Sequence, residues 1–594
     1  MKKFLIVLFI LILMTNSLVY AFDSSDETAS FPRSQESYND ENYDNIWDII
    51  KYRMRAEHFN VVGTLIFFLA ILHTLMTSVF KKFAHKAELE YEELKRKKLV
   101  DKNSKSVKGE LLHLLGEIEV VFGMWTIFLG LAIAFFYNWE TFTTYINRLH
   151  YNEPLFIIVI MAIASSRPIL RFFEQIMFTF VKMLGETLEA WWVVILILGS
   201  LLGSFITEPA AMTVCAYLLS EKVFSINPSK KLQYATLALL FVNISMGGSL
   251  TNFASPPILM VAEPWGWTTA YMFSNFGIKA IVTITLSTLV YYFYLRKDFK
   301  SMSKEYSQYR FKKYVQNKFI SQKELEDNFD ELAVLVSNNT NFYSELDSYS
   351  MILKERIKDI ARKKLSMNEV AELDIYNAIE EKYEHIKLRE FQRTVPGLLD
   401  PDLKPEYHDP HWDSREDNVP RWITLVHIGF LVWTIINVHN AVLFLGGFLF
   451  FLGFFQATSF YQNRLDLKPA LLVAFFLSGI IIHGTLQAWW ISPILANLPS
   501  LSINIAAIAL TAFNDNAALT YLATLVPDFS EGLKYSLMAG ALAGGGLTII
   551  ANSPNPVGVS ILKKHFDKGI SPVLLFKYAL VPTIITTIVF YVFK

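Results

Sequence analysis

Two stretches near opposite ends of the apolar part of this chain resemble each other, and each carries one acidic residue among apolar neighbours. Residues 207–213 read TEPAAMT and residues 514–520 read NDNAALT, which align without a gap at an offset of 307 (515 − 208). Further on, residues 247–257 (GGSLTNFASPP) match residues 544–554 (GGGLTIIANSP) at an offset of 297 (544 − 247). Duplicated halves with helix-breaking residues inside apolar segments are typical of secondary transporters. The pattern therefore predicts a membrane transporter built from two repeats.

Composition agrees with a membrane protein. Of the 594 residues, 53% are hydrophobic, and they concentrate in runs of roughly 17–25 residues, the length that crosses a hydrocarbon core. We therefore expect an all-α integral membrane protein with roughly ten to thirteen membrane segments and the lipid bilayer as its surroundings. The net charge of −1 favours no particular partner and gives no reason to expect nucleic acid binding.

Charge and hydropathy divide the chain into five predicted parts. Residues 1–21 have the basic start and apolar run of a signal peptide, with a signal anchor that stays attached as the alternative. Residues 22–56 are a polar, extracytoplasmic segment. Residues 57–295 form the first membrane half, with a repeat core at about 189–295. Ten Lys or Arg between residues 81 and 108 place the first loop in the cytoplasm. Residues 296–420 are a charged, helical cytoplasmic insert, and residues 421–594 are the second half, with a repeat core at about 500–594.

Asp515 is the strongest candidate for chemistry, because it is the only acidic or basic residue between positions 508 and 525. A charged side chain at the bilayer centre costs roughly 2.5–3.5 kcal/mol on insertion scales and is a functional candidate by default. The neighbouring Asn514 and Asn516 add neutral oxygens, so the set suits a small hard cation, and we predict a Na+ site at Asp515. The structural alternative is an Asp that caps a broken helix.

Glu208 occupies the matching place in the first half by sequence, beside Thr207 and before Pro209. Proline lacks a backbone donor and ends or starts a helix there. We expect Glu208 and Thr207 to join the cation and proton site, although a carboxylate at the membrane–water boundary would have the same sequence.

The glycine and proline motifs predict unwound backbone close to that site. Glycine removes the penalty for unwinding, and carbonyls freed in broken helices can coordinate cations. The residues expected to line the site in this way are Gly247, Gly248, Ser249, Thr251, Ser255, Pro256, Gly545, Gly546, Thr548, Asn552, Ser553 and Pro554. By contrast, Glu117 and Glu119 lie near the cytoplasmic end of a predicted second span (residues 111–137), and we interpret them as interfacial.

At these paired motifs the chain resembles the ion transporter superfamily, which includes NhaD-type sodium/proton antiporters, arsenite pumps and divalent-anion/sodium symporters. The NDNAA sequence at residues 514–518 is most similar to the bacterial sodium/proton antiporters of that superfamily. The resemblance implies two inverted repeats, each with a re-entrant hairpin that meets a broken helix at the membrane midplane. It also implies a bacterial inner-membrane location and an elevator-like movement of the core, with a homodimer as one possible assembly. The chain differs from its relatives at Glu208-Pro209, where Asp-Asn is common, and in its large insert.

Three functions follow as hypotheses. The first is sodium/proton antiport, in which Na+ and H+ compete for Asp515 as transported substrates and no cofactor is needed. The second is sodium-coupled symport of a small, dicarboxylate-like anion at half-helix N-termini, which the two acids disfavour. The third is a non-transporting membrane sensor that acts through the insert. We do not expect an enzyme, because no nucleophile, base and orienting group can be assembled from the sequence.

Overall fold

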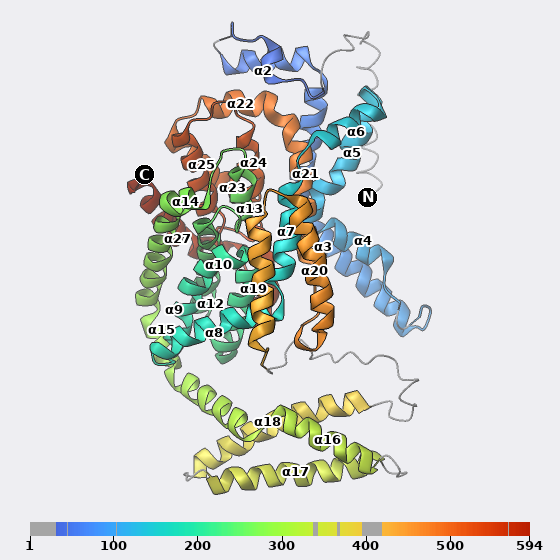
Figure 1. The fold of residues 1–594 in the computed structure, drawn as a ribbon, viewed down its shortest axis with the longest axis vertical. Coiled ribbons are helices and arrows are strands. Elements are labelled where there is room, and N and C mark those ends of the chain that lie inside the picture. The colour runs from blue at the N-terminus through green and yellow to red at the C-terminus, as the bar shows by residue number, and fades with distance from the viewer. Residues whose placement is uncertain are drawn as a thin grey trace.

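The computed structural model of the chain describes residues 31–43, 45–101, 104–336, 342–364, 369–394, 418–567 and 569–593. Over these residues the regular structure is helical and contains no strand, as Figure 1 shows. Several of the helices are long and apolar enough to cross a membrane. The predicted all-α membrane fold is therefore confirmed, whereas the predicted signal peptide at residues 1–21 lies outside the described residues.

Six helical stretches of the described chain have the length and hydropathy of a membrane span, and a bent pair makes a seventh. The bent pair is α7 (Asn152–Ala164) and α8 (Arg167–Met183), whose axes differ by 66°. The shorter apolar helices are α19 (Arg421–Ile436), α20 (Ala441–Ala457) and α23 (Ser500–Thr511). Hydropathy predicted ten to thirteen segments because it counts broken and short apolar helices together with full spans. The six long stretches are α3 (Phe59–Arg96), η2 with α5 (Ile118–Phe136), α9 to α10 (Leu188–Ile206), α14 to α15 (Thr269–Phe319), α21 to α22 (Lys468–Ala496) and α27 (Pro572–Val592).

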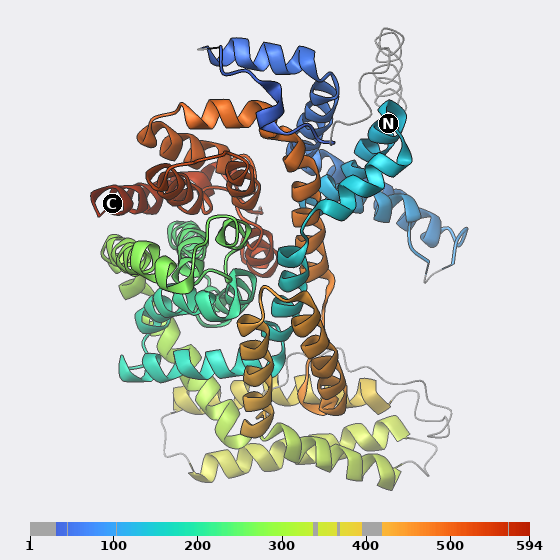
Figure 2. The ribbon, with the colours of Figure 1, turned by 45° about the horizontal axis from the view of Figure 1, so that its top comes forward.

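One group of helices, which we call the scaffold, consists of α3, α5, α7, α19, α20 and α21 (Lys468–Gly484). Its helices pack closely where side chains are absent: a Cβ at Gly479 of α21 would lie 2.5 Å from the backbone nitrogen of Gly123 in α5. In Figure 2 the scaffold helices stand largely to one side of the remaining membrane helices. The remaining helices we call the core: α9, α10, α11 (Glu208–Lys222), α12 (Lys230–Gly247), α13 (Pro256–Ala262), the first part of α15, α23, α24 (Asn516–Thr524), α25 (Glu531–Gly544), α26 (Asn555–Leu562) and α27.

The two halves of the chain interlock within the core. Helix α12 (Lys230–Gly247) is buried on all sides from Tyr234 onward, as expected of a helix that is apolar around its whole circumference. It crosses α25 (Glu531–Gly544), where the Ser245 hydroxyl donates to the carbonyl of Leu542 at 2.8 Å. Just beyond α25, a Cβ at Gly546 would lie 2.5 Å from the backbone nitrogen of Val242. Glycine therefore allows backbone from the second half to touch backbone from the first.

The described part of the N-terminal segment is tied to the end of the membrane domain opposite the insert (Figure 1). Arg53 of α2 (Ile46–Ala56) pairs with Asp40 at 2.5 Å and donates to the carbonyl of Trp489 in α22 (Ala488–Ala496) at 3.0 Å. The hydrogen bond from Arg53 to Trp489 connects residues 436 positions apart in the chain.

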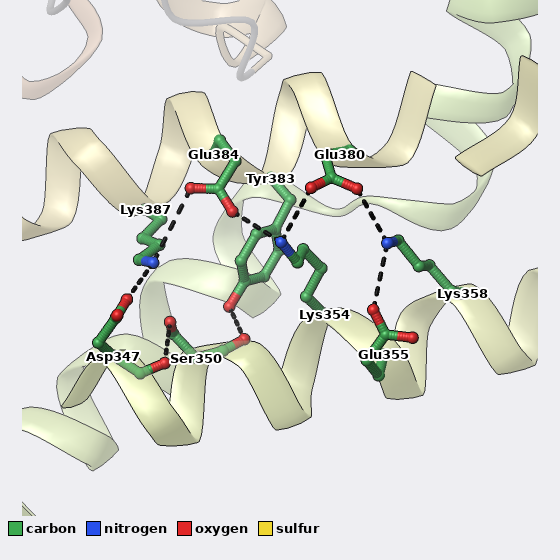
Figure 3. Close-up of polar contacts among 9 residues, drawn as sticks. All are labelled: Asp347, Ser350, Lys354, Glu355, Lys358, Glu380, Tyr383, Glu384 and Lys387. Atoms are coloured by element: carbon green, nitrogen blue, oxygen red, sulfur yellow. Dashed lines mark hydrogen bonds and ion pairs between the residues drawn. The ribbon is translucent and has the colours of Figure 1, made fainter. Parts of the chain in front are cut away.

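The described part of the charged stretch after the first half is helical. Helix α15 (Ile278–Phe319) leaves the core and continues into a bundle with α16 (Gln322–Val336), α17 (Phe342–Lys364) and α18 (Glu369–Thr394). The bundle has its own apolar core, and a row of ion pairs joins α17 to α18 (Figure 3). In that row Lys354 lies 3.1 Å from Glu380 and 3.0 Å from Glu384, while Lys358 lies 2.9 Å from Glu380.

Candidate functional site

The first helix break of the core lies between α10 (Ser200–Ile206) and α11 (Glu208–Lys222). Thr207, the residue at the break, has φ 78° and ψ 152°, a region of backbone space that is essentially restricted to glycine. Glu208 begins α11, with Pro209 in its first turn. The backbone N–H of Glu208 donates to the carbonyl of Ala254 at 3.1 Å, which lies in the unwound stretch between α12 and α13 (Pro256–Ala262). The hairpin tip and the broken helix of the first half are thus joined through backbone.

The second half repeats this arrangement with ordinary backbone geometry. Asp515 is the N-cap of α24 (Asn516–Thr524), and its carboxylate accepts a hydrogen bond from the N–H of Ala517 at 2.8 Å. The N–H of Asn516 donates to the carbonyl of Ala551 at 3.1 Å, in the stretch between α25 and α26 (Asn555–Leu562). The capping role that the sequence left open for Asp515 is therefore present.

These contacts correct the alignment of the two hairpins by one residue. Ala254 and Ala551 are equivalent at the offset of 297 (551 − 254), so their partners Glu208 and Asn516 are equivalent too, at an offset of 308 (516 − 208). On this register Asp515 matches Thr207. The sequence alignment, which placed Glu208 opposite Asp515, is wrong because it maximised residue likeness rather than position relative to the helix start.

Two further contacts support the corrected register. The Thr251 hydroxyl donates to the carbonyl of Ser204 at 2.9 Å, and the equivalent Thr548 hydroxyl donates to that of Ala512 at 2.8 Å. The carbonyl positions again differ by 308 (512 − 204), and the threonines by 297 (548 − 251).

Close packing agrees with the same register. A Cβ at Gly248 would lie 2.4 Å from the Glu208 carboxyl, and a Cβ at the equivalent Gly545 would lie 3.0 Å from the Asn516 amide. Glu208 and Asn516 therefore occupy equivalent positions, each packed against the matching glycine, Gly248 or Gly545.

Glu208 joins the two halves. Its side chain is fully buried, and its Oε2 accepts a hydrogen bond from Asn552 Nδ2, in the broken helix of the second half, at 2.8 Å. Ser255 lies beside the same carboxyl. The carboxylates of Glu208 and Asp515 are close enough to interact electrostatically. The structure therefore brings both predicted acids into one buried region.

Several buried oxygens in this region have no hydrogen-bond partner in the structure. Side-chain oxygens are hard ligands of the kind that small cations prefer. Buried polar atoms without a hydrogen-bond partner are uncommon and need an explanation. Within the described residues, no group of three or more His, Cys, Asp or Glu side chains could hold a metal ion, so any cation would depend largely on amide and hydroxyl oxygens. The unpaired oxygens are Thr207 Oγ1, Asn514 Oδ1, Asn516 Oδ1 and Asn552 Oδ1, whereas the Ser255 hydroxyl contacts the Glu208 carboxyl.

Other residues predicted to line the site have different contacts. Gly247 serves close packing, because a Cβ there would lie 2.0 Å from the carbonyl oxygen of Ser200. The Ser249 hydroxyl is satisfied by the carbonyl of Met246. Pro256 is the first residue of α13 and Pro554 is the N-cap of α26. The Ser553 backbone hydrogen-bonds Asp515.

Glu119 is a further acid close to this region that sequence reasoning did not select. The predicted span over residues 111–137 is broken: α4 (Val107–Leu115) ends, and Glu119 lies in the short helix η2 (Ile118–Val120) before α5. From there Glu119 acts electrostatically on Asp515. The glycine at position 116, before the acid pair, was the available signal that the helix ends early.

The fold and this region define the class of the protein: a multi-pass membrane protein whose core has paired helix breaks around buried carboxylates. The model of a family described as "Putative Na+/H+ antiporter" matches residues 58–320 and 400–593, and the chain belongs to this family. The match omits residues 321–399, which include α16, α17 and α18. A comparison with curated proteins found no match. Family membership supports a cation/proton transporter.

Proposed function

We propose that the protein exchanges Na+ for H+ and that both ions compete for the buried region around Asp515 and Glu208. The observation that carries this proposal is the set of unpaired oxygens beside two carboxylates at two helix breaks. A cation there would satisfy these oxygens and balance the carboxylate charge, whereas protons would neutralise the carboxylates without filling the space.

Asp515 is the better candidate for a direct Na+ ligand. Its carboxylate lies at the N-terminus of α24 and accepts a backbone hydrogen bond, which holds it in one orientation. Glu208 is held by Asn552 of the other half, so its protonation state affects the contact between the halves. We therefore propose that Asp515 binds the cation, while Glu208 couples its binding to the arrangement of the two broken helices.

Two observations weigh against the alternative functions. A small anion would have to bind beside two carboxylates, which repel it. A sensor acting through the insert would place the activity in α16 to α18, and the family match omits these helices.

The test is cation-triggered release of protons from everted membrane vesicles made from an antiporter-deficient host. Vesicles with an acidic interior receive Na+, Li+ or K+, and the collapse of the pH gradient is followed by dye fluorescence. We expect the wild-type response to Na+ to disappear in Asp515→Asn. The matched control is Asp528→Asn, because Asp528 is exposed and has a left-handed backbone, φ 50°, that Asn also tolerates.

A wild-type response that survives Asp515→Asn unchanged would refute the assignment of the site. The absence of any response to the three cations, from folded wild-type protein at several pH values, would refute antiport itself. Uptake of a labelled dicarboxylate would then test the symporter.

A further inference from the structure

A cavity lies where α15 leaves the membrane domain, away from the helix breaks. It has a volume of about 980 Å³ and is bounded by α8, the start of α9 (Leu188–Val194), the end of α11 and residues 306–318 of α15. In Figure 1, α8 and α9 lie beside α15 just above the insert. The cavity therefore borders both the core and the helix that carries the bundle.

Cations dominate the charged side chains of this cavity. Lys222, Arg310, Lys313 and Lys318 line it against a single carboxylate, that of Glu186. Lys222 lies 2.7 Å from Glu221, just outside the lining, and Lys318 donates to the Tyr314 hydroxyl at 2.7 Å.

Arg310 and Lys313 differ from the other two cations. Within the described part of the chain, neither forms an ion pair with an acidic side chain, and both belong to the face of α15 that lines the cavity. Two cations without an acidic partner match an anion with several acceptor oxygens, such as a phosphate group.

The surface next to the cavity is apolar and faces away from the protein. Phe178 of α8 lines the cavity and is 45% exposed, and at the end of the same helix Met183 is 77% exposed. The aromatic ring of Trp191 forms another part of the wall, beneath the Lys222 ammonium. Exposed apolar side chains beside a basic pocket at a membrane boundary suit a ligand that is both anionic and lipid-like.

We propose that this cavity binds the headgroup of an anionic phospholipid. Its phosphate oxygens accept hydrogen bonds from Arg310 and Lys313, and its acyl chains lie along the exposed face of α8. Bound there, the lipid bridges α15 to α8 and α9 and thereby links the insert to the membrane surface. This site lies apart from the carboxylates and does not depend on the ion that the protein transports.

The experiment measures binding of fluorescent phosphatidylglycerol to the purified full-length protein in neutral detergent by fluorescence polarisation. Arg310→Ala/Lys313→Ala removes two cations from the cavity. Lys300→Ala/Lys304→Ala removes two cations from exposed positions on the same helix that do not line it. We expect the first variant to bind at least tenfold more weakly than wild type, and the control variant to bind like wild type. If the double variant does not fold, Lys313→Gln alone provides the comparison.

Two further measurements separate the possible ligands. Labelled phosphatidylcholine should bind at least tenfold more weakly than phosphatidylglycerol, and inorganic phosphate at millimolar concentration should not displace the lipid. Equal binding of the two lipids, or equal losses in the cavity and control variants, would overturn the proposal. Displacement by inorganic phosphate would assign the cavity to a soluble anion and overturn the lipid assignment.

Discussion

The hydrogen bond between Glu208 and Asn552 is the contact whose removal tests the candidate region most directly. Both side chains are fully buried, and the donor and acceptor are 2.8 Å apart across the two halves. Asn552→Ala leaves Glu208 Oε2 buried without this donor. A hydrogen bond to a charged group contributes about 1.5–3 kcal/mol, and one between neutral groups about 0.5–1.5 kcal/mol.

A double-mutant cycle isolates this energy from the cost of truncation. Thermal unfolding in detergent is measured for wild type, Asn552→Ala, Glu208→Gln and the double variant, with free energies compared at a common temperature. Gln keeps an acceptor oxygen but has no charge, so we expect a coupling energy of about 1 kcal/mol, the difference between the charged and the neutral bond. Repeating the cycle at alkaline pH should increase the coupling if Glu208 then ionises more fully.

The control cycle combines Glu208→Gln with Asn504→Ala. Asn504 donates to the carbonyl of Ser536 at 2.9 Å within the second half, and within the described residues it shares no hydrogen-bond partner with Glu208. We expect this pair to be additive within about 0.5 kcal/mol. If the Glu208–Asn552 cycle were equally additive at every pH, the charge of Glu208 would not strengthen the contact across the halves, and a coupling role for its protonation state would be refuted.

Two other predictions concern packing and charge. Gly546→Ala places a Cβ 2.5 Å from the Val242 backbone, which cannot rotate away. We therefore expect the free energy of unfolding to fall by about 3 kcal/mol, measured by thermal unfolding. An unchanged melting temperature would contradict the crossing of α12 and α25. In the insert, hydrogen bonds from Lys358 and Lys354 lower the pKa of Glu380 below its usual 4.5. The folded bundle thus favours the ionised form of Glu380, which stabilises the fold. This stabilisation is complete above pH 4.5 and is lost as the pH falls through the lowered pKa that Glu380 has in the folded bundle. Hydrogen exchange of α17 and α18, corrected for intrinsic rates, should show reduced protection over that window, and Glu380→Gln should weaken this dependence.

The sequence was sufficient to predict the helical membrane fold and the helix breaks near residues 207, 247–257, 514 and 544–554. Paired glycines and prolines act locally, since they determine where backbone donors are missing and where chains can touch. Gly247 and Gly546 illustrate this, because any Cβ there would overlap backbone from a neighbouring helix.

The register of the hairpins could not be predicted in the same way. It depends on whether the acid precedes the helix, as Asp515 does, or begins it, as Glu208 does. That difference follows from tertiary hydrogen bonds to Ala551 and Ala254, which local residue likeness does not encode. Glu119 was missed for a related reason, because the break after α4 interrupts an apolar run that hydropathy treats as continuous.

Thr207 provides a final test of whether the first hairpin is held in a strained state by its surroundings. A β-branched residue at φ 78° and ψ 152° costs about 1–3 kcal/mol, whereas glycine adopts this conformation freely at a cost of up to about 1 kcal/mol in unfolded-chain entropy. Thr207→Gly and Thr207→Ala both remove the unpaired hydroxyl, but only the glycine variant relieves the backbone. We therefore expect Thr207→Gly to be about 1–2 kcal/mol more stable than Thr207→Ala in thermal unfolding. If the Thr207 hydroxyl binds the cation, both variants should lose Na+-dependent proton release equally. Equal stability of the two variants would refute the strain, and retention of transport by both would exclude the hydroxyl from the site while leaving Asp515 to be tested separately.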